Sequence, residues 1–324
     1  MRRREFITLL GAAAWPLAAR AQQAKVATIG LLGTGSAAAQ SQWTAAFVQR
    51  MRDLGWVDGR NLTIEYRWAE GHYERLPALI ADLVQHKVSV IAATGTNAAV
   101  AAKRATTTIP IVFEMGSDPV ELGLVASLSQ PGSNVTGVTN FTVDLGSKQL
   151  GLLRELVPGT TAIAALMNPN FAGAEKELGD VEAAARILGL QLIVLRAGTE
   201  REIETAFATI AQQGVHALLV GIDPFLTAQC NQIVALAARH AIPAVYPLRD
   251  FAVAGGLMSY GTDFADAYRQ GGIYTGRILR GEKPADLPVQ RSTKFEFVIN
   301  FKTAKTLGIE VPNSMQLLAT EVIE

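Results

Sequence analysis

Residues 26–54 read VATIGLLGTGSAAAQSQWTAAFVQRMRDL. A β-branched, apolar run ends at Gly33, and a turn of small residues follows it. Apolar side chains then recur every three or four positions from Trp43 to Leu54. That spacing is typical of a helix with one buried face. The stretch therefore predicts a strand, a turn and a helix, which is the beginning of a βαβ unit.

The same alternation continues along the first half of the chain. Further strands are expected at residues 62–66, 88–93, 109–113 and 135–138, with helices at 73–85, 98–105 and 119–128. Short strands separated by helices of roughly 10–15 residues indicate a parallel sheet.

The second half of the chain repeats this order. Strands are expected at residues 162–167, 191–195, 217–220, 244–246 and 257–260, with helices at 175–188, 200–212 and 227–240. Residues 80–94 (IADLVQHKVSVIAAT) are echoed by residues 207–221 (FATIAQQGVHALLVG), and residues 101–113 by residues 235–246. Two similar α/β lobes in one chain predict a cleft between them.

Composition excludes several classes of protein. Of 324 residues, 49% are apolar and 18% charged, which is too apolar for a disordered chain. The 29 basic and 29 acidic residues balance, so no general attraction to nucleic acid is expected. Cys230 is the single cysteine, which excludes an internal disulfide and a cysteine zinc site. The four histidines have no ligand spacing, so we expect no metal.

The first 21 residues resemble a secretory signal. A basic start precedes an apolar run that is too short to span a membrane, and Ala19-Arg20-Ala21 has the pattern of a cleavage site. Arg3-Arg4 resembles a twin-arginine signal, although Arg2 stands where Ser or Thr is usual. We expect export to the periplasm, with cleavage near Ala21, by either route. The alternative is an apolar helix packed on the first lobe.

Ligands of open parallel sheets bind beyond the carboxyl ends of the strands. The turns that follow the expected strands carry small, polar and helix-capping residues, with aromatic side chains nearby. Each such residue alone is usually only a cap, but their clustering at one edge of both sheets indicates a binding site. The candidate ligand-binding residues are Gly33, Thr34, Ser36, Gly95, Thr96, Asn97, Gly116, Ser117, Asp118, Asn140, Asn168, Phe171, Asp223, Phe225, Tyr246, Arg249 and Asp250.

Catalytic motifs are sparse. Neither a G-x-S-x-G elbow nor a Walker loop occurs, so we expect a binding protein rather than an enzyme. Gly33-x-Gly35-x-x-Ala38 fits a dinucleotide fingerprint, which leaves an exported NAD(P)-dependent oxidoreductase as an alternative. Against it, the helix begins only near Gln40, and no acidic residue ends the second strand. We expect no cofactor.

Longer phrases resemble a known family. They are LGWVDGRNLTIEYRWAEG (54–71), IPIVFEMGSDPVELGLVASLSQPGSNVTGVTN (109–140), AAARILGLQL (183–192), GGLMSYGTDFADAYRQGGIYTGRILRGEKPADLPV (255–289) and KFEFVINFKTAKTLGIEVP (294–312). The chain from about residue 25 to 311 resembles substrate-binding proteins of ABC transporters, in the family that includes tryptophan- and tyrosine-binding members.

The resemblance implies a type I periplasmic binding fold: two Rossmann-like lobes joined by a hinge of several crossing segments. The expected lobes are residues 25–140 with 264–286, and 141–263 with 287–324. The crossings are expected near residues 137–144, 259–263 and 284–291.

The resemblance also implies the function. A small polar or amino-acid-like ligand is enclosed between the lobes and delivered to a permease in the inner membrane. Asp223 and Asp250 are candidate partners of a ligand ammonium group, while Arg249 leaves an acidic ligand open. A receptor for a membrane sensor would share the fold and the pocket. A sugar-regulator-type transcription factor would need a DNA-binding headpiece, for which the residues before the first strand are too few.

Overall fold

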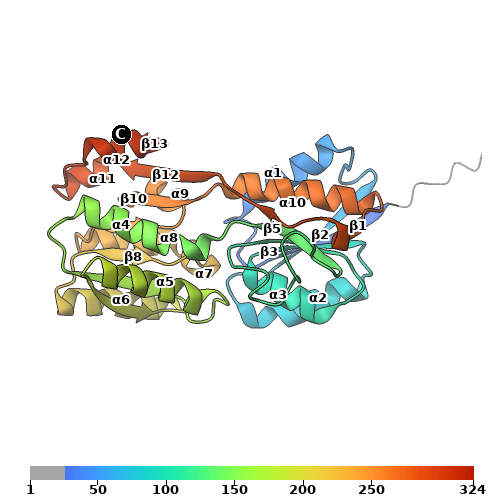
Figure 1. Cartoon of the computed structure of the whole chain (residues 1–324), viewed down its shortest axis with the longest axis horizontal. Coiled ribbons are helices and arrows are strands. Elements are labelled where there is room, and N and C mark those ends of the chain that lie inside the picture. Colours follow the sequence, from blue (N-terminus) through green and yellow to red (C-terminus); the bar gives the residue numbers. More distant parts are fainter. Residues whose placement is uncertain (1–25) are drawn as a thin grey trace, which may run out of the picture.

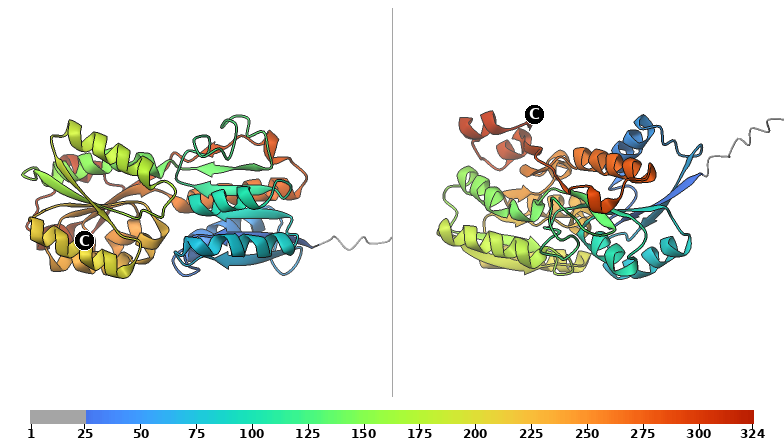
Figure 2. Two further views of the ribbon diagram at one scale, coloured as in Figure 1. Left: turned by 90° about the horizontal axis from the view of Figure 1, so that it is seen from below. Right: turned by 45° about the vertical axis from the view of Figure 1, so that its right-hand side comes forward.

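The computed structural model describes residues 26–324, so the predicted signal segment lies outside the described residues. Two α/β lobes lie side by side and are linked by extended segments (Figure 1). Each lobe holds one sheet with helices on both faces (Figure 2). The two-lobe α/β architecture expected from the sequence is thus confirmed.

The first lobe contains a six-stranded sheet in the order β11-β5-β4-β3-β1-β2, all parallel. Its strands are β1 (Ala27–Gly33), β2 (Leu62–Trp68), β3 (Val90–Thr94), β4 (Ile111–Met115), β5 (Val135–Thr139) and β11 (Gln290–Arg291). Its helices are α1 (Ser41–Asp53), α2 (Leu76–Gln85), α3 (Thr96–Ala105) and α10 (Phe264–Leu279), with short 3₁₀ turns η1 (Tyr73–Arg75) and η3 (Pro284–Asp286).

The second lobe contains a seven-stranded sheet in the order β13-β12-β10-β9-β8-β6-β7. Its strands are β6 (Ala162–Met167), β7 (Gln191–Arg196), β8 (Leu218–Val220), β9 (Ala244–Tyr246), β10 (Met258–Thr262), β12 (Phe295–Asn300) and β13 (Glu321–Ile323). All neighbours are parallel except β12, which runs antiparallel to β10. Its helices are α4 (Gly146–Leu156), α5 (Ala174–Ile187), α6 (Glu200–Gln213), α7 (Pro224–Ala228), α8 (Cys230–Arg239), α9 (Arg249–Val253), α11 (Phe301–Thr306) and α12 (Asn313–Leu318).

Successive side chains of a strand pack alternately into the two hydrophobic cores of each lobe, one on each face of the sheet. On β1, Ile29 and Leu31 pack with Phe47 of α1 and Tyr268 of α10, whereas Leu32 packs on the opposite face beneath α2 and α3. Strands that are buried on both faces need apolar residues at consecutive positions, which is why residues 26–32 are almost wholly apolar. Among the described residues, no helix is both long enough and apolar enough to cross a membrane.

The chain crosses between the lobes three times: after β5 through the 3₁₀ turn η2 (Thr142–Asp144), between β10 and α10, and between β11 and β12 (Figure 1). The last crossing lies later than expected. Gln290 pairs with Val138 and Arg291 with Thr139, so residues 287–291 run with the first lobe rather than with the second.

The helix expected at residues 119–128 is wrong, because this segment forms consecutive turns. The carboxylate of Asp118 accepts a hydrogen bond from the backbone N–H of Val120, at 2.7 Å, and bends the chain. Gly123 then takes a positive φ of 67°, which a helix does not accommodate.

Candidate functional site

The carboxyl ends of both sheets face the junction of the lobes. In the first sheet the strand order reverses direction between β1 and β3, and in the second between β6 and β8. Such switch points open a crevice where connections leave on opposite faces of the sheet. The turns at Gly33–Thr34 and Gly95–Thr96 and those at Asn168 and Gly221 lie at these two points.

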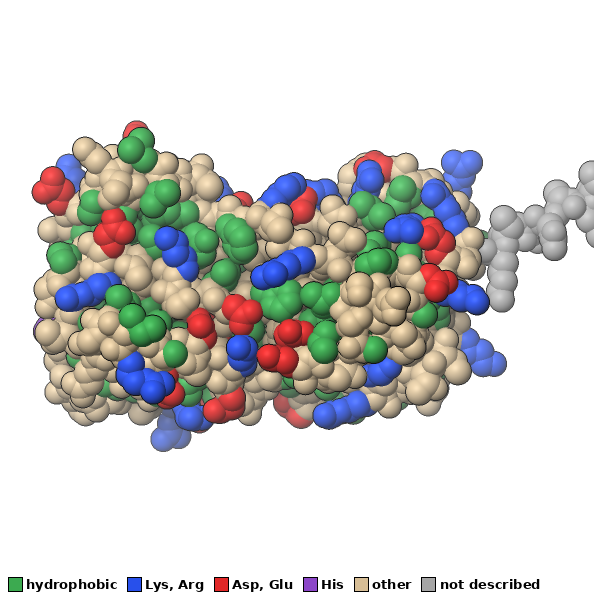
Figure 3. All heavy atoms as spheres, in the orientation of Figure 1, with side chains coloured by type: hydrophobic (Ala, Val, Ile, Leu, Met, Phe, Trp, Pro, Cys, Tyr) green, Lys and Arg blue, Asp and Glu red, His purple; other side chains and the backbone are tan. Residues whose placement is uncertain are grey.

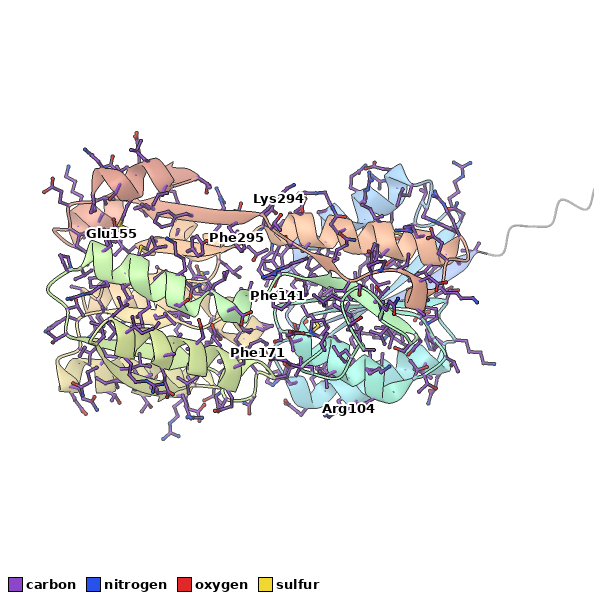
Figure 4. All side chains as sticks on the ribbon, viewed as in Figure 1. Arg104, Phe141, Glu155, Phe171, Lys294 and Phe295 are labelled. Atoms are coloured by element: carbon purple, nitrogen blue, oxygen red, sulfur yellow. The ribbon has the colours of Figure 1, made fainter. Side chains whose placement is uncertain are left out.

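A cavity of about 590 Å³, counted with the solvent at its mouth, lies between the lobes at this junction. Residues from both lobes line it: Thr34, Gly35, Ala39, Gln40, Trp43, Gly95, Thr96, Glu114, Gly116, Thr142, Phe264 and Tyr268 from the first lobe and its crossing, and Phe171, Ile222, Pro224, Thr227 and Leu248 from the second. Figure 4 shows Phe141 and Phe171 where the lobes meet.

Aromatic rings form one wall of this cavity. The ring centroids of Trp43 on α1 and Phe264 on α10 lie 5.0 Å apart with an interplanar angle of 29°, and Tyr268 lies 6.0 Å from Trp43. The close packing of α1 against α10 holds the three rings together. Offset aromatic rings of this kind present a flat, apolar surface to a ligand.

Glu114 is the single charged residue among those that line the cavity. Its side chain is 5% exposed, and Nδ2 of Asn140 donates a hydrogen bond to its Oε1 at 2.9 Å. Burial raises the pKa of Glu114 to about 8, and the hydrogen bond from Asn140 opposes this rise only in part. No Lys, Arg or His among the described residues forms an ion pair with it. The site therefore favours a ligand that brings its own positive charge.

The amino end of α3 lies beside Glu114. Thr94, at the end of β3, pairs with Glu114 in the neighbouring strand, and α3 begins two residues later at Thr96. Gly95 caps this helix without a side-chain hydrogen bond, so the first backbone N–H groups have no side-chain acceptor. A Cβ at Gly95, where φ is 101°, would lie 2.4 Å from Oγ1 of Thr34. The turn therefore requires glycine, and it presents an anion-binding helix end to the cavity.

Two further polar atoms near the cavity have no hydrogen-bond partner within the described chain. They are Oγ1 of Thr142 and Oδ1 of Asn140, and both side chains are almost fully buried. A Cβ at Gly116 would lie 2.0 Å from Oγ1 of Thr142. Both oxygens can accept a hydrogen bond from a polar ligand, and the hydroxyl of Thr142 can also donate one. Glycine at position 116 keeps the space open.

Several hydrogen bonds join the lobes around the cavity. The hydroxyl of Tyr73 in the first lobe donates to Oδ2 of Asp223 in the second. Asn97 donates to the carbonyl of Asn170 and accepts from the N–H of Ala172, both at 3.0 Å. Direct contact of the lobes at these points shows a closed arrangement.

Five of the residues expected at the site line the cavity: Thr34, Gly95, Thr96, Gly116 and Phe171. Two others contact residues that line the cavity. Asn140 forms a hydrogen bond with Glu114, and the hydroxyl oxygens of Ser117 and Thr96 lie 3.2 Å apart. Asn97 and Asp223 join the lobes.

The remaining expected residues have local roles in the structure. Gly33 ends β1 against Trp68, Ser36 accepts the N–H of Ala39, and Asp118 closes its own turn. Asn168 donates to Asp223 at 3.0 Å, and Phe225 packs against the second-lobe core. Tyr246 is stacked on Phe251 inside that core, whereas Arg249 and Asp250 line a second pocket.

Glu114, Thr142, Phe264 and Tyr268 line the cavity but are not among the residues predicted from the sequence. Glu114 lies between the expected strand, which ends at residue 113, and the turn of small and polar residues that begins at Gly116. Phe264 and Tyr268 are spaced by four on one helix, which is also the spacing of core residues. For Glu114, the signal was available: an acidic residue directly after three consecutive apolar residues, Ile111–Phe113, of a buried strand.

Asp223 is also held by its own lobe. Its carboxylate accepts hydrogen bonds from Asn168, from the backbone N–H of Leu226 and from Tyr73. With these partners satisfied and the side chain 1% exposed, Asp223 does not line the cavity.

One group of potential metal ligands occurs within residues 26–324, on the surface of the first lobe. It consists of Glu65, Asp82 and His86. The guanidinium of Arg67 already bonds to both carboxylates, at 3.0 Å to Glu65 and 2.7 Å to Asp82. Their negative charge is therefore partly balanced by Arg67.

Comparison with known sequences places the chain among binding proteins. A sequence model of the family described as ABC transporter substrate binding protein matches residues 35–323. The chain is 26% identical over 265 residues to a tyrosine-binding protein of Clostridioides difficile (strain R20291), which covers 82% of this chain and 76% of that protein.

Solved structures show the same fold. An ABC domain in complex with L-Trp from Streptococcus pneumonia has a TM-score of 0.84 at 26% identity, covering 92% of this chain and 99% of that one. The ligand-free, open structure of a substrate binding protein with adhesive properties from Clostridium difficile covers the same shares at 25% identity, with a TM-score of 0.65. The lower score against the open structure agrees with the closed arrangement of the lobes in this chain.

Glu177 is a second buried carboxyl near the cavity, and its protonation state in the folded protein can be tested. It lies on α5 and accepts the backbone N–H of Ile222, a lining residue, at 2.9 Å. Burial, with Asp223 nearby, raises the pKa of Glu177 to about 8. Between the usual pKa of a carboxyl and this value, the folded state holds a proton that the unfolded state has lost, so stability falls as the pH rises.

We therefore expect the free energy of unfolding of Glu177→Gln to rise relative to wild type by roughly 1.4 kcal/mol per pH unit between pH 5 and pH 8, with no gain near pH 4. Denaturant titrations across this pH range measure the difference. Glu175→Gln, an exposed position on the same helix, is the matched control. Equal pH dependence in Glu177→Gln and wild type would contradict the buried, protonated state of Glu177.

Proposed function

Because the chain belongs to the family of ABC transporter substrate binding proteins, we propose that it binds an aromatic L-amino acid between its lobes and delivers it to a membrane permease. The family match confirms the expectation of a binding protein rather than an enzyme. The observation that carries the choice of ligand is a single buried carboxyl, Glu114, at the edge of an aromatic cavity.

Each part of an aromatic amino acid has a counterpart in the cavity. The ammonium group pairs with Glu114, and the carboxylate accepts from the free N–H groups at the start of α3. Thr94 and Glu114 are paired neighbours in the sheet, and adjacent strands lie roughly 4.8 Å apart. The carboxyl of Glu114 and the amino end of α3 are therefore close enough to contact the ammonium and the carboxylate of one α-amino acid. The ring packs against Trp43, Phe264 and Tyr268.

Closure of the lobes then completes the site. Phe171, Ile222 and Leu248 of the second lobe cover the ligand, while Tyr73 and Asn97 of the first lobe bond to the second. A ligand that binds both lobes shifts the equilibrium toward the closed form. The permease then recognises the closed form.

Export depends on the N-terminal residues. The basic start, the apolar run and Ala19-Arg20-Ala21 support removal of residues 1–21 as a signal. We expect the mature protein in the periplasm with its first residue at position 22. N-terminal sequencing of the periplasmic fraction measures this, and an intact Met1 in the mature protein would contradict it.

Ligand recognition is tested by isothermal titration of L-tryptophan and L-tyrosine. We expect both to bind, and N-acetyl-L-tryptophan to bind far more weakly because it lacks the ammonium group. Glu114→Gln should lose at least about 30-fold in affinity, since breaking a buried charge pair costs roughly 2–5 kcal/mol. Glu175→Gln should bind as wild type does.

The pH dependence follows from the raised pKa of Glu114. An ammonium group stabilises the ionised carboxyl, so binding below pH 8 must release its proton. The affinity for L-tryptophan should rise between pH 6 and pH 8 by up to about tenfold per pH unit. Glu114→Gln should remove this slope. Equal binding of the N-acetyl ligand, or an unchanged pH profile in Glu114→Gln, would refute the assigned role of Glu114.

The contact between Tyr73 and Asp223 is tested separately. Neither residue lines the cavity, so Tyr73→Phe acts on closure alone. It leaves a buried carboxylate oxygen without its donor in the closed form, whereas water solvates that oxygen in the open form. The apparent affinity for L-tryptophan should fall about tenfold, since a hydrogen bond to a charged group contributes roughly 1.5–3 kcal/mol.

Tyr66→Phe is the control for this variant, because Tyr66 lies on β2 and is 36% exposed. Small-angle scattering with and without ligand reports the closed fraction directly. An unchanged affinity and closed fraction in Tyr73→Phe would show that this contact does not hold the lobes together.

A further inference from the structure

A second pocket, which we call the acidic pocket, lies beside the main cavity. Its volume is about 390 Å³, counted with the solvent at its mouth. It is lined by Gln42, Trp43, Leu248, Arg249, Asp250, Thr262, Asp263, Phe264, Ala265 and Glu296. Trp43, Leu248 and Phe264 line both the main cavity and the acidic pocket. The acidic pocket lies where the chain crosses between β10 and α10, close to the crossing strand that carries Lys294 and Phe295 (Figure 4).

The charges around the acidic pocket do not balance. Arg249 also lines the pocket, but its guanidinium forms two hydrogen bonds of 2.6 Å with Glu321, so a single positive charge is shared between Glu321 and the carboxylates of the pocket. Among the described residues, the side chain of Asp250 accepts hydrogen bonds only from the amide of Gln42, the shorter at 3.3 Å. Glu296 has neither a hydrogen bond nor an ion pair from its side chain within residues 26–324.

Asp263 adds a third carboxylate. Its Oδ1 caps α10 by accepting the N–H of Asp266 at 2.9 Å, and the guanidinium of Arg269 lies 3.6 Å from Oδ2. Lys294 is paired with Asp266, at 2.7 Å. The basic groups nearby are therefore engaged elsewhere or shared, and the pocket retains a negative charge on Asp250 and Glu296.

A buried hydroxyl is an independent sign of a ligand. Thr262 is 2% exposed and lines the acidic pocket, and its Oγ1 has no hydrogen-bond partner among the described residues. Buried polar atoms are nearly always hydrogen-bonded. A donor placed in the pocket would satisfy this oxygen.

The arrangement of the carboxylates selects the kind of cation. Within residues 26–324, the carboxylates of this pocket do not come within 4.8 Å of one another as a group of three, as ligands of one metal ion would. A guanidinium presents five N–H donors in a planar fork and can reach separated acceptors. It also stacks on aromatic faces, which Trp43 and Phe264 supply.

We propose that the acidic pocket binds an alkylguanidinium group next to the ligand of the main cavity. The group bonds to Asp250, Glu296 and Thr262 and lies against Trp43 and Phe264. Gln42 and Trp43 belong to the first lobe, whereas Asp250 and Glu296 belong to the second. The bound cation therefore bridges the lobes. Burial and the neighbouring Asp263 carboxylate raise the pKa of Glu296, and the positive charge of Arg249 opposes this rise only in part.

The acidic pocket is tested by isothermal titration of the whole protein with 1-butylguanidinium chloride. We expect saturable binding that persists when L-tryptophan is present, and no binding of 1-butylurea, a neutral analogue of similar shape. Glu296→Gln and Asp250→Asn should each weaken binding about fivefold, as loss of one partly exposed ion pair predicts. Glu175→Gln and Glu114→Gln should bind the cation as wild type does.

Three results would overturn the proposal. The first is absence of saturable binding to the wild-type protein. The second is that Glu296→Gln and Asp250→Asn bind the cation with the same affinity as wild type. The third is displacement of the cation by calcium chloride. If L-tryptophan or Glu114→Gln abolishes binding, the cation occupies the main cavity and the proposal also fails. The amino-acid site is tested separately: a protein that binds butylguanidinium through Glu296 but no aromatic amino acid would retain this pocket and lose the proposed function.

Discussion

A carboxyl group buried without a basic partner is the constraint around which this protein is arranged. Glu114 lies at the end of β4, where burial favours its protonated form. Transfer of an isolated carboxylate from water to such a place is strongly unfavourable. In the proposed function, a cationic ligand would remove the penalty, because it would supply the missing charge. The missing charge would then make the site select cationic ligands over neutral ones.

Parallel strands explain why the recognition groups meet. All strands that lie side by side in the first sheet end at one edge, so Glu114 and the amino end of α3 are neighbours although 18 residues separate Glu114 from Thr96 along the chain. The second sheet repeats this geometry and faces the first. On the face seen in Figure 3, acidic and hydrophobic side chains gather near the junction of the lobes. Because the walls of the cavity belong to two different lobes, a ligand that contacts both walls stabilises the closed arrangement of the lobes.

Hinge and site are connected by the same segments. Asn140, which bonds to Glu114, and Thr142, which lines the cavity, belong to the crossing that follows β5. Thr262 and Phe264 belong to the crossing before α10. A ligand that orders these residues also restricts the segments about which the lobes move. The acidic pocket lies on the second of these crossings, so an occupant there would act on the same motion.

Periodicity in the sequence determined the βαβ order, the duplication into two lobes and the edge of the sheets at which the cavity lies, because these depend on local spacing and on the geometry of parallel sheets. Five turn residues of the cavity followed from that edge alone. Tertiary structure decided the rest. Asp223 and Asp250, expected near a ligand ammonium, form hydrogen bonds with Tyr73 and Gln42 of the other lobe. Trp43, Phe264 and Tyr268 have the spacing of ordinary core residues, and only the packing of α1 on α10 places them in the cavity wall. Whether a carboxylate lacks a partner depends on every side chain that folding brings near it, and most of those are distant in the sequence.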